Sequence, residues 1–448
     1  MCPSRRNLLS FLALVTLCFA AWASADEPTP GRANVTPKPL DEKTQKGIDY
    51  LISQQHDDGG WGQGGGWRTG EKGRVEGVEV KDPPDLGNTC IAALVLIRAG
   101  NTETQGPYAA NLARAVDFIC HHVESADKDS LWVTDIRDTQ LQSKIGRYAD
   151  TFLAGLVLSE LKGKLQDSPL ARRADADLEK VIAKIERNQQ HDGTFVGNAG
   201  WASVLSQCLC SKALNRAFQN GVVVKQESLD RDFKIAFNTA KPLAGESVYT
   251  GGTTIALSGG TLLGGAAGGI GGSASISSAG VDLYAFSAGN AVASENIKSN
   301  AGIAKQAQAV LNNPEAKDGE KEKARQELKR VDEMASVQKA ALAGIVDRLG
   351  DKKFIDGFGN NGGEEFLSYM NISETLLAQG GKEWEKWDAQ MSENLHRVQN
   401  SDGSWSGHHC ITGRTFCTST ALLALMADRS PAPLADAIQE KKASEPTR

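Results

Sequence analysis

The sequence predicts an all-α protein in which six outer and six inner helices alternate around a ring, an α6/α6 toroid, with a glycine-rich insertion. Two repeated patterns lead to this prediction. A turn made of Gln, Asp-Gly and an aromatic residue occurs three times and is closed by Trp61, Phe195 and Trp405. A segment of the form Thr-x-x-Ala-x-Leu-x-Leu also occurs three times. Repeated helix pairs indicate stacked hairpins, because one pair alone cannot bury its apolar face.

The repeated turn starts at a glutamine that ends an amphipathic helix: Gln54, Gln189 and Gln399. The residue four positions before each glutamine is apolar or aromatic: Tyr50, Ile185 and Leu395. A spacing of four places both side chains on one helix face. The Asp-Gly pair then ends the helix, because glycine accepts the left-handed backbone of a C-terminal cap. We therefore expect Trp61 and Trp405 to be buried against a neighbouring helix end.

The second pattern marks the inner helices. It covers 89–96, 151–158 and 418–425, a degraded copy covers 203–210, and a further copy begins at Ser368. The expected outer helices cover about 41–55, 107–124, 170–190, a segment from 228, 336–349 and 384–399. The expected inner helices cover about 85–99, 147–162, 200–220, 364–379 and 414–427, and the fourth pair is interrupted.

The interruption is an insertion at about 245–330. Its first part is a glycine-rich run over 251–289, in which the stretch 259–272 has too many glycines to form a stable helix in water. A phosphate-binding loop is disfavoured, because no Gly-Lys-Ser/Thr follows. We expect a flexible or hairpin-like insertion across one mouth of the ring. The charged part over 314–329 places Glu and Lys at helical spacing and predicts a solvated helix.

The N-terminal residues 1–25 are typical of an export signal. Arg5 and Arg6 precede an apolar run over 8–21, and Ala23-Ser-Ala25 fits a cleavage site. We therefore expect a secreted protein, in the periplasm or outside the cell, exported by either the general or the twin-arginine route. Residues 26–40 are expected to form a flexible arm, and 431–448 a flexible tail.

The charge of the processed chain limits its partners. Removing residues 1–25 leaves 47 basic and 55 acidic residues and a net charge of −8. This acidity argues against binding to nucleic acid or to anionic lipid. No other apolar run is long enough for a membrane span.

The first turn resembles a known repeat. Lys46-Gly47, Tyr50, Gln54 and Gly59-Gly60-Trp61 are similar to the QW motif, the prenyltransferase and squalene oxidase repeat, of squalene and oxidosqualene cyclases. The same terpenoid cyclase-like superfamily includes the β subunits of protein prenyltransferases. The resemblance implies an α/α toroid over most of the processed chain, and a structural role for the Gln and the aromatic residue of each turn. It does not imply an activity, because fold does not determine function.

The catalytic motifs of these relatives are not recognisable in the chain. The Asp-x-Asp-Asp acid of the cyclases is missing. The prenyltransferase zinc motif Asp-x-Cys has His408 in place of Asp before Cys410. Toroidal polysaccharide lyases use a Tyr, Lys, Arg or His base, which Tyr148, Arg147 or His409 could supply.

The candidate site follows from position. In a toroid the N-termini of the inner helices converge on one mouth, where their unpaired N–H groups favour anions. The candidate ligand-binding residues lie at these positions: His408, His409, Cys410, Arg414, Glu364, Glu365, Tyr148 and Arg147. Other residues that open inner helices are Asp85, Asn88, Asp150, Trp201 and Thr415.

The loop of His408, His409 and Cys410 is the first choice among these. The equivalent turns after Trp61 and Phe195 contain neither imidazole nor thiol. A helix N-terminus is expected to lower the pKa of a nearby thiol, and histidine can act as a base or a metal ligand near neutral pH.

Six cysteines remain after processing: Cys90, Cys120, Cys208, Cys210, Cys410 and Cys417. Cys410 and Cys417 could form a local disulfide, or could bind zinc with His408 or His409, and the others are expected to be buried thiols. No cofactor is expected unless it is this zinc ion.

Two classes of function remain. The first is a ligand-binding toroid whose central cavity holds an apolar or glycan small molecule. The second is an enzyme, either a divergent terpenoid cyclase or prenyltransferase relative or a polysaccharide lyase. An aromatic cavity wall would indicate an isoprenoid, and Arg, Lys and Tyr an acidic glycan. We favour the first class.

Overall fold

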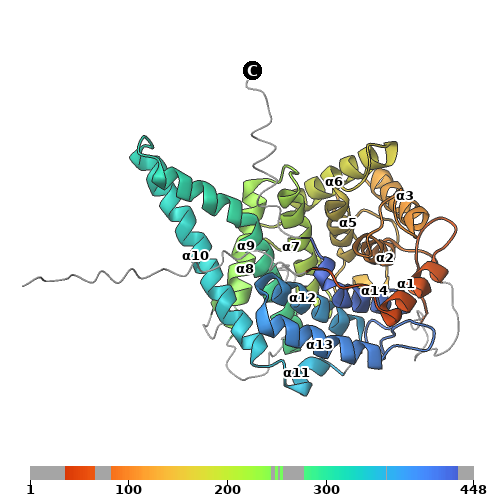
Figure 1. The fold of residues 1–448 in the computed structure, drawn as a ribbon. Helices are drawn as coiled ribbons and strands as arrows, with labels where there is room; N and C mark the ends of the chain where they lie inside the picture. The colour runs from red at the N-terminus through yellow and green to blue at the C-terminus, as the bar shows by residue number, and fades with distance from the viewer. Residues whose placement is uncertain are drawn as a thin grey trace, which may run out of the picture.

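The protein is almost entirely helical in the computed structural model (Figure 1). The structure describes residues 36–65, 82–243, 248–250, 253–255, 277–359 and 361–431. The all-α prediction is confirmed for this part of the chain. One short antiparallel hairpin of β1 (Val248–Thr250) and β2 (Thr253–Ile255) pairs Val248 with Ile255. The predicted signal peptide and the glycine-rich stretch 256–276 lie outside the described residues, as does the tail after residue 431.

Six helices form the inside of the molecule. They are α2 (Leu86–Arg98), α5 (Ala149–Leu161), α7 (Ser203–Gln219), α9 (Asp282–Asn312), α12 (Gly363–Gln379) and α14 (Arg414–Leu425). Five are buried along almost their whole length, and α9 is buried mainly over 283–300. Each of the six packs against the next, and α14 packs against α2, so that their contacts run in a closed cycle. Their apolar residues lie on all sides, as expected for helices surrounded by protein.

Six amphipathic helices cover the outside. They are α1 (Glu42–Gln54), α3 (Ala109–Ser125), α6 (Pro169–Asn188), α8 (Gln226–Leu243), α10 (Asp318–Val346) and α13 (Gly381–Arg397). Each packs on at least one inner helix. Their starts have ordinary capping chemistry: the Ser168 hydroxyl accepts the N–H of Ala171 at 3.1 Å, and Pro169 occupies the first turn of α6. Short helices α4 (Gln140–Lys144) and α11 (Lys352–Asp356) and the 3-10 helix η1 (Ala427–Arg429) complete the set.

The turns at Trp61 and Trp405 have matching glutamine hydrogen bonds, with one correction to the expected register, whereas the side chain of Gln189 forms no hydrogen bond within the described residues. The Gln399 amide donates to Gly403 O at 2.9 Å, and the residue that makes the equivalent bond to Gly59 O is Gln55, not Gln54. Gln54 donates to the adjacent Ser53 hydroxyl instead. The glutamine that forms this bond stands six residues before the tryptophan in both turns. In the first turn that residue is Gln55, and the residue four positions before it is Leu51 rather than Tyr50.

The tryptophans of these turns fasten the outer helix end to the core. The indole N–H of Trp61 donates to Leu51 O at 2.7 Å, and that of Trp405 to Leu395 O at 2.8 Å. Both indoles are completely buried, as predicted. Phe195 is also buried and packs on Phe152, with ring centroids 5.1 Å apart.

Glycine is required in these turns for two reasons. Gly59 and Gly403 have φ values of 92° and 93°, in the left-handed region that disfavours other residues. A Cβ on Gly403 would also lie 2.5 Å from Lys46 O, and one on Gly59 would lie 2.4 Å from Arg114 O. Each turn therefore lies directly against the backbone of a neighbouring outer helix.

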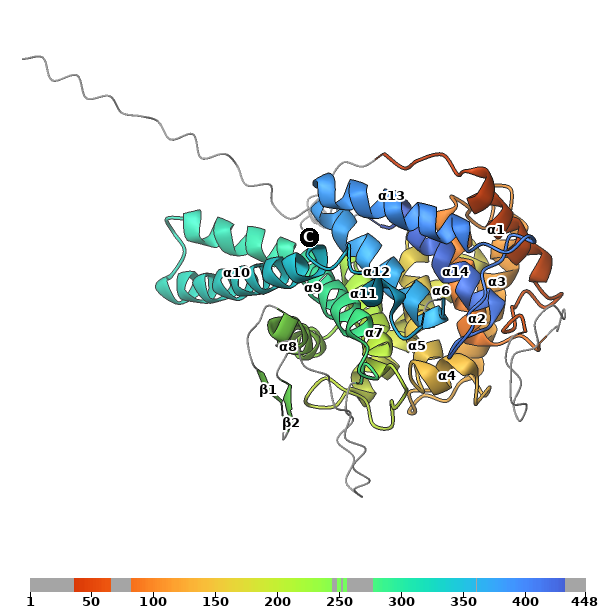
Figure 2. The ribbon, with the colours of Figure 1, turned by 90° about the horizontal axis from the view of Figure 1, so that it is seen from below.

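The predicted insertion over 245–330 is too long. Helix α9 begins at Asp282, buries Leu283, Tyr284 and Phe286, and belongs to the inner cycle. The Ala, Ser, Gly and Asn residues that follow are small enough for close contact with α7 and α12. The first of them were predicted to belong to the glycine-rich run over 251–289. The predicted charged helix exists but continues to Val346 as α10, so the expected outer helix at 336–349 is its second half. The hairpin of α9 and α10 projects beyond the other helices in both views (Figures 1 and 2).

Residues 36–40 were expected to belong to the flexible arm but lie against the helices. The Lys38 N–H donates to the Asp428 carboxylate at 2.7 Å, and the Lys38 ammonium contacts Asp388 at 2.5 Å. Among the described helices, none combines the length and the hydrophobicity that a membrane span requires.

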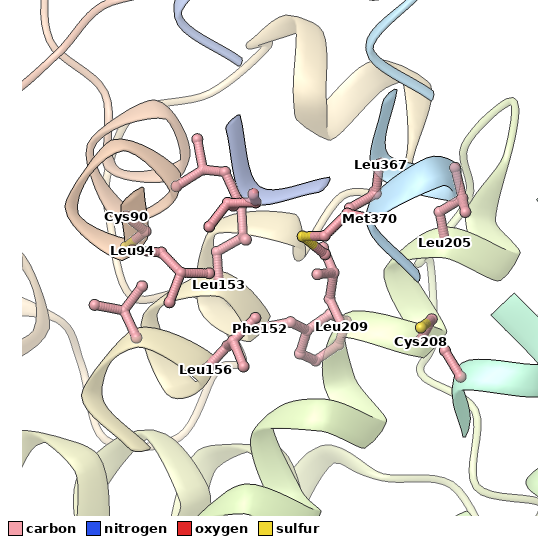
Figure 3. Packing of buried hydrophobic residues seen from close by; sticks show 14 of the residues in the cluster. Cys90, Leu94, Phe152, Leu153, Leu156, Leu205, Cys208, Leu209, Leu367 and Met370 are labelled. Carbon is pink, nitrogen blue, oxygen red and sulfur yellow. The ribbon is translucent and has the colours of Figure 1, made fainter. Parts of the chain in front are cut away.

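Apolar side chains fill the space between the inner helices (Figure 3). Leu94, Leu153, Leu209, Leu367 and Met370 come from four different inner helices and are all completely buried. Protein interiors packed in this way have few voids larger than a water molecule. At this level the expected central cavity is therefore occupied by the side chains of the protein.

A buried network of charges lies in the C-terminal halves of α2, α5, α7 and α12 and near the middle of the longer α9. It joins three cations and three anions, all less than 5% exposed as side chains: Arg98, Lys212 and Arg216 with Glu160, Glu295 and Glu374. Glu374 contacts Arg98 at 2.5 Å and both Lys212 and Arg216 at 2.8 Å. Burial opposes the ionisation of Glu374, but these three cations outweigh it and hold the pKa of Glu374 well below its ordinary value.

Candidate functional site

The candidate residues that the structure brings together lie at the N-terminus of α12. Glu364 and Glu365 occupy its first turn, and both are completely buried. The loop that carries His409 and Cys410 packs over them, and Tyr284 of α9 reaches them from the other side. We call these five residues the carboxyl site.

Glu365 is held by three groups. Its carboxylate accepts the Tyr284 hydroxyl at 2.5 Å and the Phe358 N–H at 2.9 Å, and the Nε2 atom of His409 lies 3.5 Å away. Burial raises the pKa of Glu365 although these hydrogen bonds oppose the rise. Burial and the charge of Glu365 raise the pKa of Tyr284, so Tyr284 remains a hydrogen-bond donor.

Glycines let the backbone approach Glu365. A Cβ on Gly357 would lie 2.6 Å from one oxygen of Glu365, and a Cβ on Gly362 would lie 2.6 Å from the other oxygen and from His409. Gly357 also has a φ of 59°. The segment between α11 and α12 can therefore cover Glu365 only with glycine at these two positions.

Glu364 has fewer partners. One of its oxygens accepts the Ile411 N–H at 3.2 Å, while Oε1 has no hydrogen-bond partner in the described part of the chain. Burial raises the pKa of Glu364 to about 8, and repulsion from Glu365 adds to the rise. The raised pKa favours the protonated form of Glu364, which can donate a hydrogen bond or a proton.

Cys410 does not have the lowered pKa that the sequence analysis expected from the nearby helix N-terminus. Burial and the adjacent Glu364 carboxyl raise the pKa of Cys410 to about 12. A thiol beside a carboxylate resists ionisation, and this effect outweighs the dipole of α14. Cys410 also has a φ of 49°, so the loop turns sharply at this residue.

The two histidines extend the carboxyl site toward the surface. The rings of His408 and His409 lie 4.7 Å apart, and His408 is exposed. The backbone N–H of His408 donates to the backbone oxygen of Asn361 at 2.8 Å, so the loop is fixed to the segment before α12. His409 also contacts the ring of Phe358 at 5.3 Å.

The other three candidates lie elsewhere. Arg414 pairs with Asp402 of the repeated turn at 2.9 Å. The Tyr148 hydroxyl donates to Val196 O at 3.2 Å, and its ring packs on Trp132. Arg147 is exposed. Among the described contacts, none of these three side chains reaches Glu364 or Glu365.

A second pair of buried acids lies at the N-termini of α2 and α5. Asp85 caps α2 by accepting the Asn88 N–H at 2.8 Å, and Asp150 accepts the Gln142 amide at 2.5 Å. Burial, followed by repulsion between the two, raises the pKa of Asp85 to about 7, and burial raises that of Asp150 to about 6. Asp85 at the N-cap of α2 and Asp150 in the first turn of α5 therefore occupy helix N-termini that we expected to attract an anion.

The six described cysteines form no disulfide and belong to no cluster arranged to hold a metal ion. Cys417, the expected partner of Cys410, is buried and donates to Ile411 O at 3.4 Å. No group of three or more His, Cys, Asp or Glu side chains in the described residues is arranged to hold a metal ion. The zinc and disulfide alternatives therefore find no support in this geometry.

Sequence reasoning missed Tyr284 and Phe358. Tyr284 was assigned to the insertion, although Leu283 and Phe286 beside it have the i, i+3 spacing of a helix face. Phe358 lies in a glycine-rich turn with no periodic signal. Comparison of the chain with models of known protein families, with curated proteins and with solved structures gave no match.

Proposed function

We propose that the chain is an exported α/α toroid of the QW-repeat type that binds a small-molecule ligand at the carboxyl site. The closed cycle of six inner helices and the six helices around it support the toroid. The matching hydrogen bonds of the turns at Trp61 and Trp405 support the repeat. The composition of residues 1–25 supports export.

We place the ligand site at the mouth of the ring rather than in the central cavity that the sequence predicted. Packed side chains such as Leu153 and Met370 occupy the centre, whereas the carboxyl site lies beneath the surface loop of His408 and His409.

One observation carries this proposal. Glu364 and Glu365 are adjacent and completely buried, and the positive charge of Lys144 lowers the pKa of Glu364 less than burial raises it. Burying such groups costs free energy that the fold does not recover. Acids whose pKa values are raised in this way concentrate at functional sites.

The test is a titration of the full processed chain with two kinds of probe, farnesol as an apolar ligand and cellohexaose as a saccharide. We expect one probe to bind, and the variants Glu364→Gln and His409→Ala to weaken its binding about tenfold, which is 1.4 kcal/mol. His396→Ala is the matched control, because His396 is a partly buried histidine of α13 whose ring lies 3.4 Å from Asp41 at the start of α1. Equal affinity in all three variants would exclude the carboxyl site.

An acid–base enzyme is the second candidate, and the proton on Glu364 favours it. A carboxylic acid that stays protonated near pH 7 is suited to general acid catalysis. Incubation of the bound probe followed by mass spectrometry separates the two candidates. Conversion by the wild type and none by Glu364→Gln would establish an enzyme, and an unchanged probe would favour a binding protein.

A further inference from the structure

Two exposed aromatic side chains form a patch beside the carboxyl site. Trp201 precedes α7 and is 41% exposed, and Phe358 follows α11 and is 51% exposed. Their ring centroids lie 5.5 Å apart at an interplanar angle of 77°. Contiguous exposed apolar side chains typically mark an interaction site.

The aromatic patch continues into the carboxyl site. The ring of Phe358 contacts that of His409 at 5.3 Å, and His409 contacts His408 at 4.7 Å. Four rings therefore follow one another from Trp201 to His408. The apolar rings lie at one end of this row, and the nitrogen atoms that can hydrogen-bond lie at the other.

Backbone hydrogen bonds hold both aromatic residues in place. The Phe358 N–H donates to Glu365 at 2.9 Å. The Ala202 N–H, next to Trp201, donates to Lys144 O at 2.8 Å. A preformed surface loses little conformational entropy when a ligand binds. The buried Glu365 thus has a second role, as a fixed anchor for the exposed ring of Phe358.

The shape of this surface favours a saccharide over an isoprenoid. An apolar ligand needs an enclosed cavity of about 300–1,000 Å³, whereas completely buried side chains such as Leu94, Leu153 and Met370 fill the space between the inner helices. A pyranose ring has C–H faces that pack on the negative faces of aromatic rings. Its hydroxyl groups can hydrogen-bond to imidazole nitrogens.

We propose that the ligand of this site is a saccharide, with one sugar ring packed on Trp201 and Phe358 and its hydroxyl groups bound by His408 and His409. This inference rests on the proposed function and names its ligand class. The loop of Arg147 adjoins that of Trp201, since a Cβ on Gly200 would lie 2.7 Å from the Gly146 nitrogen. Arg147 is exposed and forms no ion pair within the described residues, so it is placed to attract an acidic saccharide.

The experiment titrates the full processed chain with cellohexaose, chitohexaose, hexagalacturonate and farnesol by calorimetry. We expect at least one saccharide to bind and farnesol not to bind. Trp201→Ala and Phe358→Ala should each weaken saccharide binding about tenfold, with an unchanged circular dichroism spectrum, and Trp201→Phe should retain most of the affinity. Val223→Ala is the control, because Val223 is 92% exposed in the connection between α7 and α8.

The outcomes separate this inference from the proposed function. Preference for hexagalacturonate that is lost in Arg147→Ala supports an acidic saccharide, and equal binding of cellohexaose supports a neutral one. Saccharide binding that survives both aromatic substitutions overturns the inference. If farnesol binds, His409→Ala abolishes this binding and no saccharide binds, then the inference is overturned and the proposed function stands. Failure of all four probes to bind overturns both.

Discussion

The two ends of the inner helices bury the same chemical group in opposite electrostatic states. At the N-terminal end, burial raises the pKa of Glu364 to about 8 and that of Asp85 to about 7. At the C-terminal end, burial acts in the same direction, but Arg216 and its neighbouring cations outweigh it and lower the pKa of Glu295 to about 2. The partner, rather than the depth of burial, decides whether a buried carboxyl group is charged.

This difference assigns different roles to the two ends. The C-terminal network satisfies its own charges and is a structural element of the closed cycle. The cations near the N-terminal acids, Lys144 for Glu364 and Arg137 for Asp150, do not outweigh burial, so the pKa values of these acids stay raised, which is typical of groups that serve a ligand. The following predictions test this division, beginning with the largest expected effect.

Arg216→Met should destabilise the protein by about 3–5 kcal/mol at pH 7, because it leaves buried carboxylates without their shared cation. Chemical denaturation measures the free energy of unfolding. Arg187→Met is the control, since Arg187 is exposed and pairs with Asp129 at the surface, where an ion pair contributes about 0–1 kcal/mol. A loss below about 1 kcal/mol for Arg216→Met would show that the network is not structural.

The C-terminal carboxylates predict a loss of stability in acid. The pKa of Glu295 is about 2 in the folded protein and near 4.5 when unfolded, so its stabilisation is complete above pH 4.5 and is lost as the pH falls toward 2. Glu160 and Glu374 have lowered pKa values and act in the same direction. Denaturation at a series of pH values should show this slope in the wild type. Stability that does not fall between pH 4.5 and 3 would contradict the prediction.

The N-terminal acids predict the opposite slope at higher pH. The pKa of Glu364 is raised from 4.5 to about 8, so its contribution is complete below pH 4.5 and is lost as the pH rises through 8. One such group changes the free energy of unfolding by at most about 1.4 kcal/mol per pH unit. Glu364→Gln cannot ionise and should flatten the slope between pH 5 and 8. An identical slope in the variant would mean that Glu364 is ionised at neutral pH.

Cys410→Ala should have the smallest effect. The thiol is half-buried and forms no disulfide, so the change in the free energy of unfolding should stay below about 1 kcal/mol and should be equal in oxidising and reducing buffer. A loss confined to oxidising buffer would instead indicate a disulfide.

The helical elements were predictable because their signals are local. Amphipathic spacing and the Asp-Gly turns located the outer helices and the burial of Trp61 and Trp405. Gln54 was predicted in the role of Gln55 because the two glutamines are adjacent in the sequence. Only the hydrogen bond to Gly59 distinguishes them. Helix α9 was missed because its Ser, Asn and Gly residues have low helix propensity and because packing against α7 and α12 stabilises it.

The contacts within the candidate site were not predictable from the sequence. The pairing of His409 with Glu365, and of Cys410 with Glu364, depends on contacts between segments about 45 residues apart, as in the hydrogen bond from Ile411 to Glu364. The sequence placed this loop and the first turn of α12 at one mouth but predicted the wrong direction for the pKa of Cys410. The filling of the centre depends on side chains from several inner helices together, which no single segment reveals.

The closed cycle has a consequence for how the chain folds. Helix α1 packs on α14, and the Lys38 N–H bonds to Asp428, a separation of 390 residues. The first helix therefore lacks one of its two inner neighbours until the end of the chain has been synthesised. Contacts between such distant segments slow folding, because a long loop must close before the contact forms. If residues 1–25 direct export, the general route would deliver helix α1 across the membrane before α14. The twin-arginine route would carry the chain after it has folded.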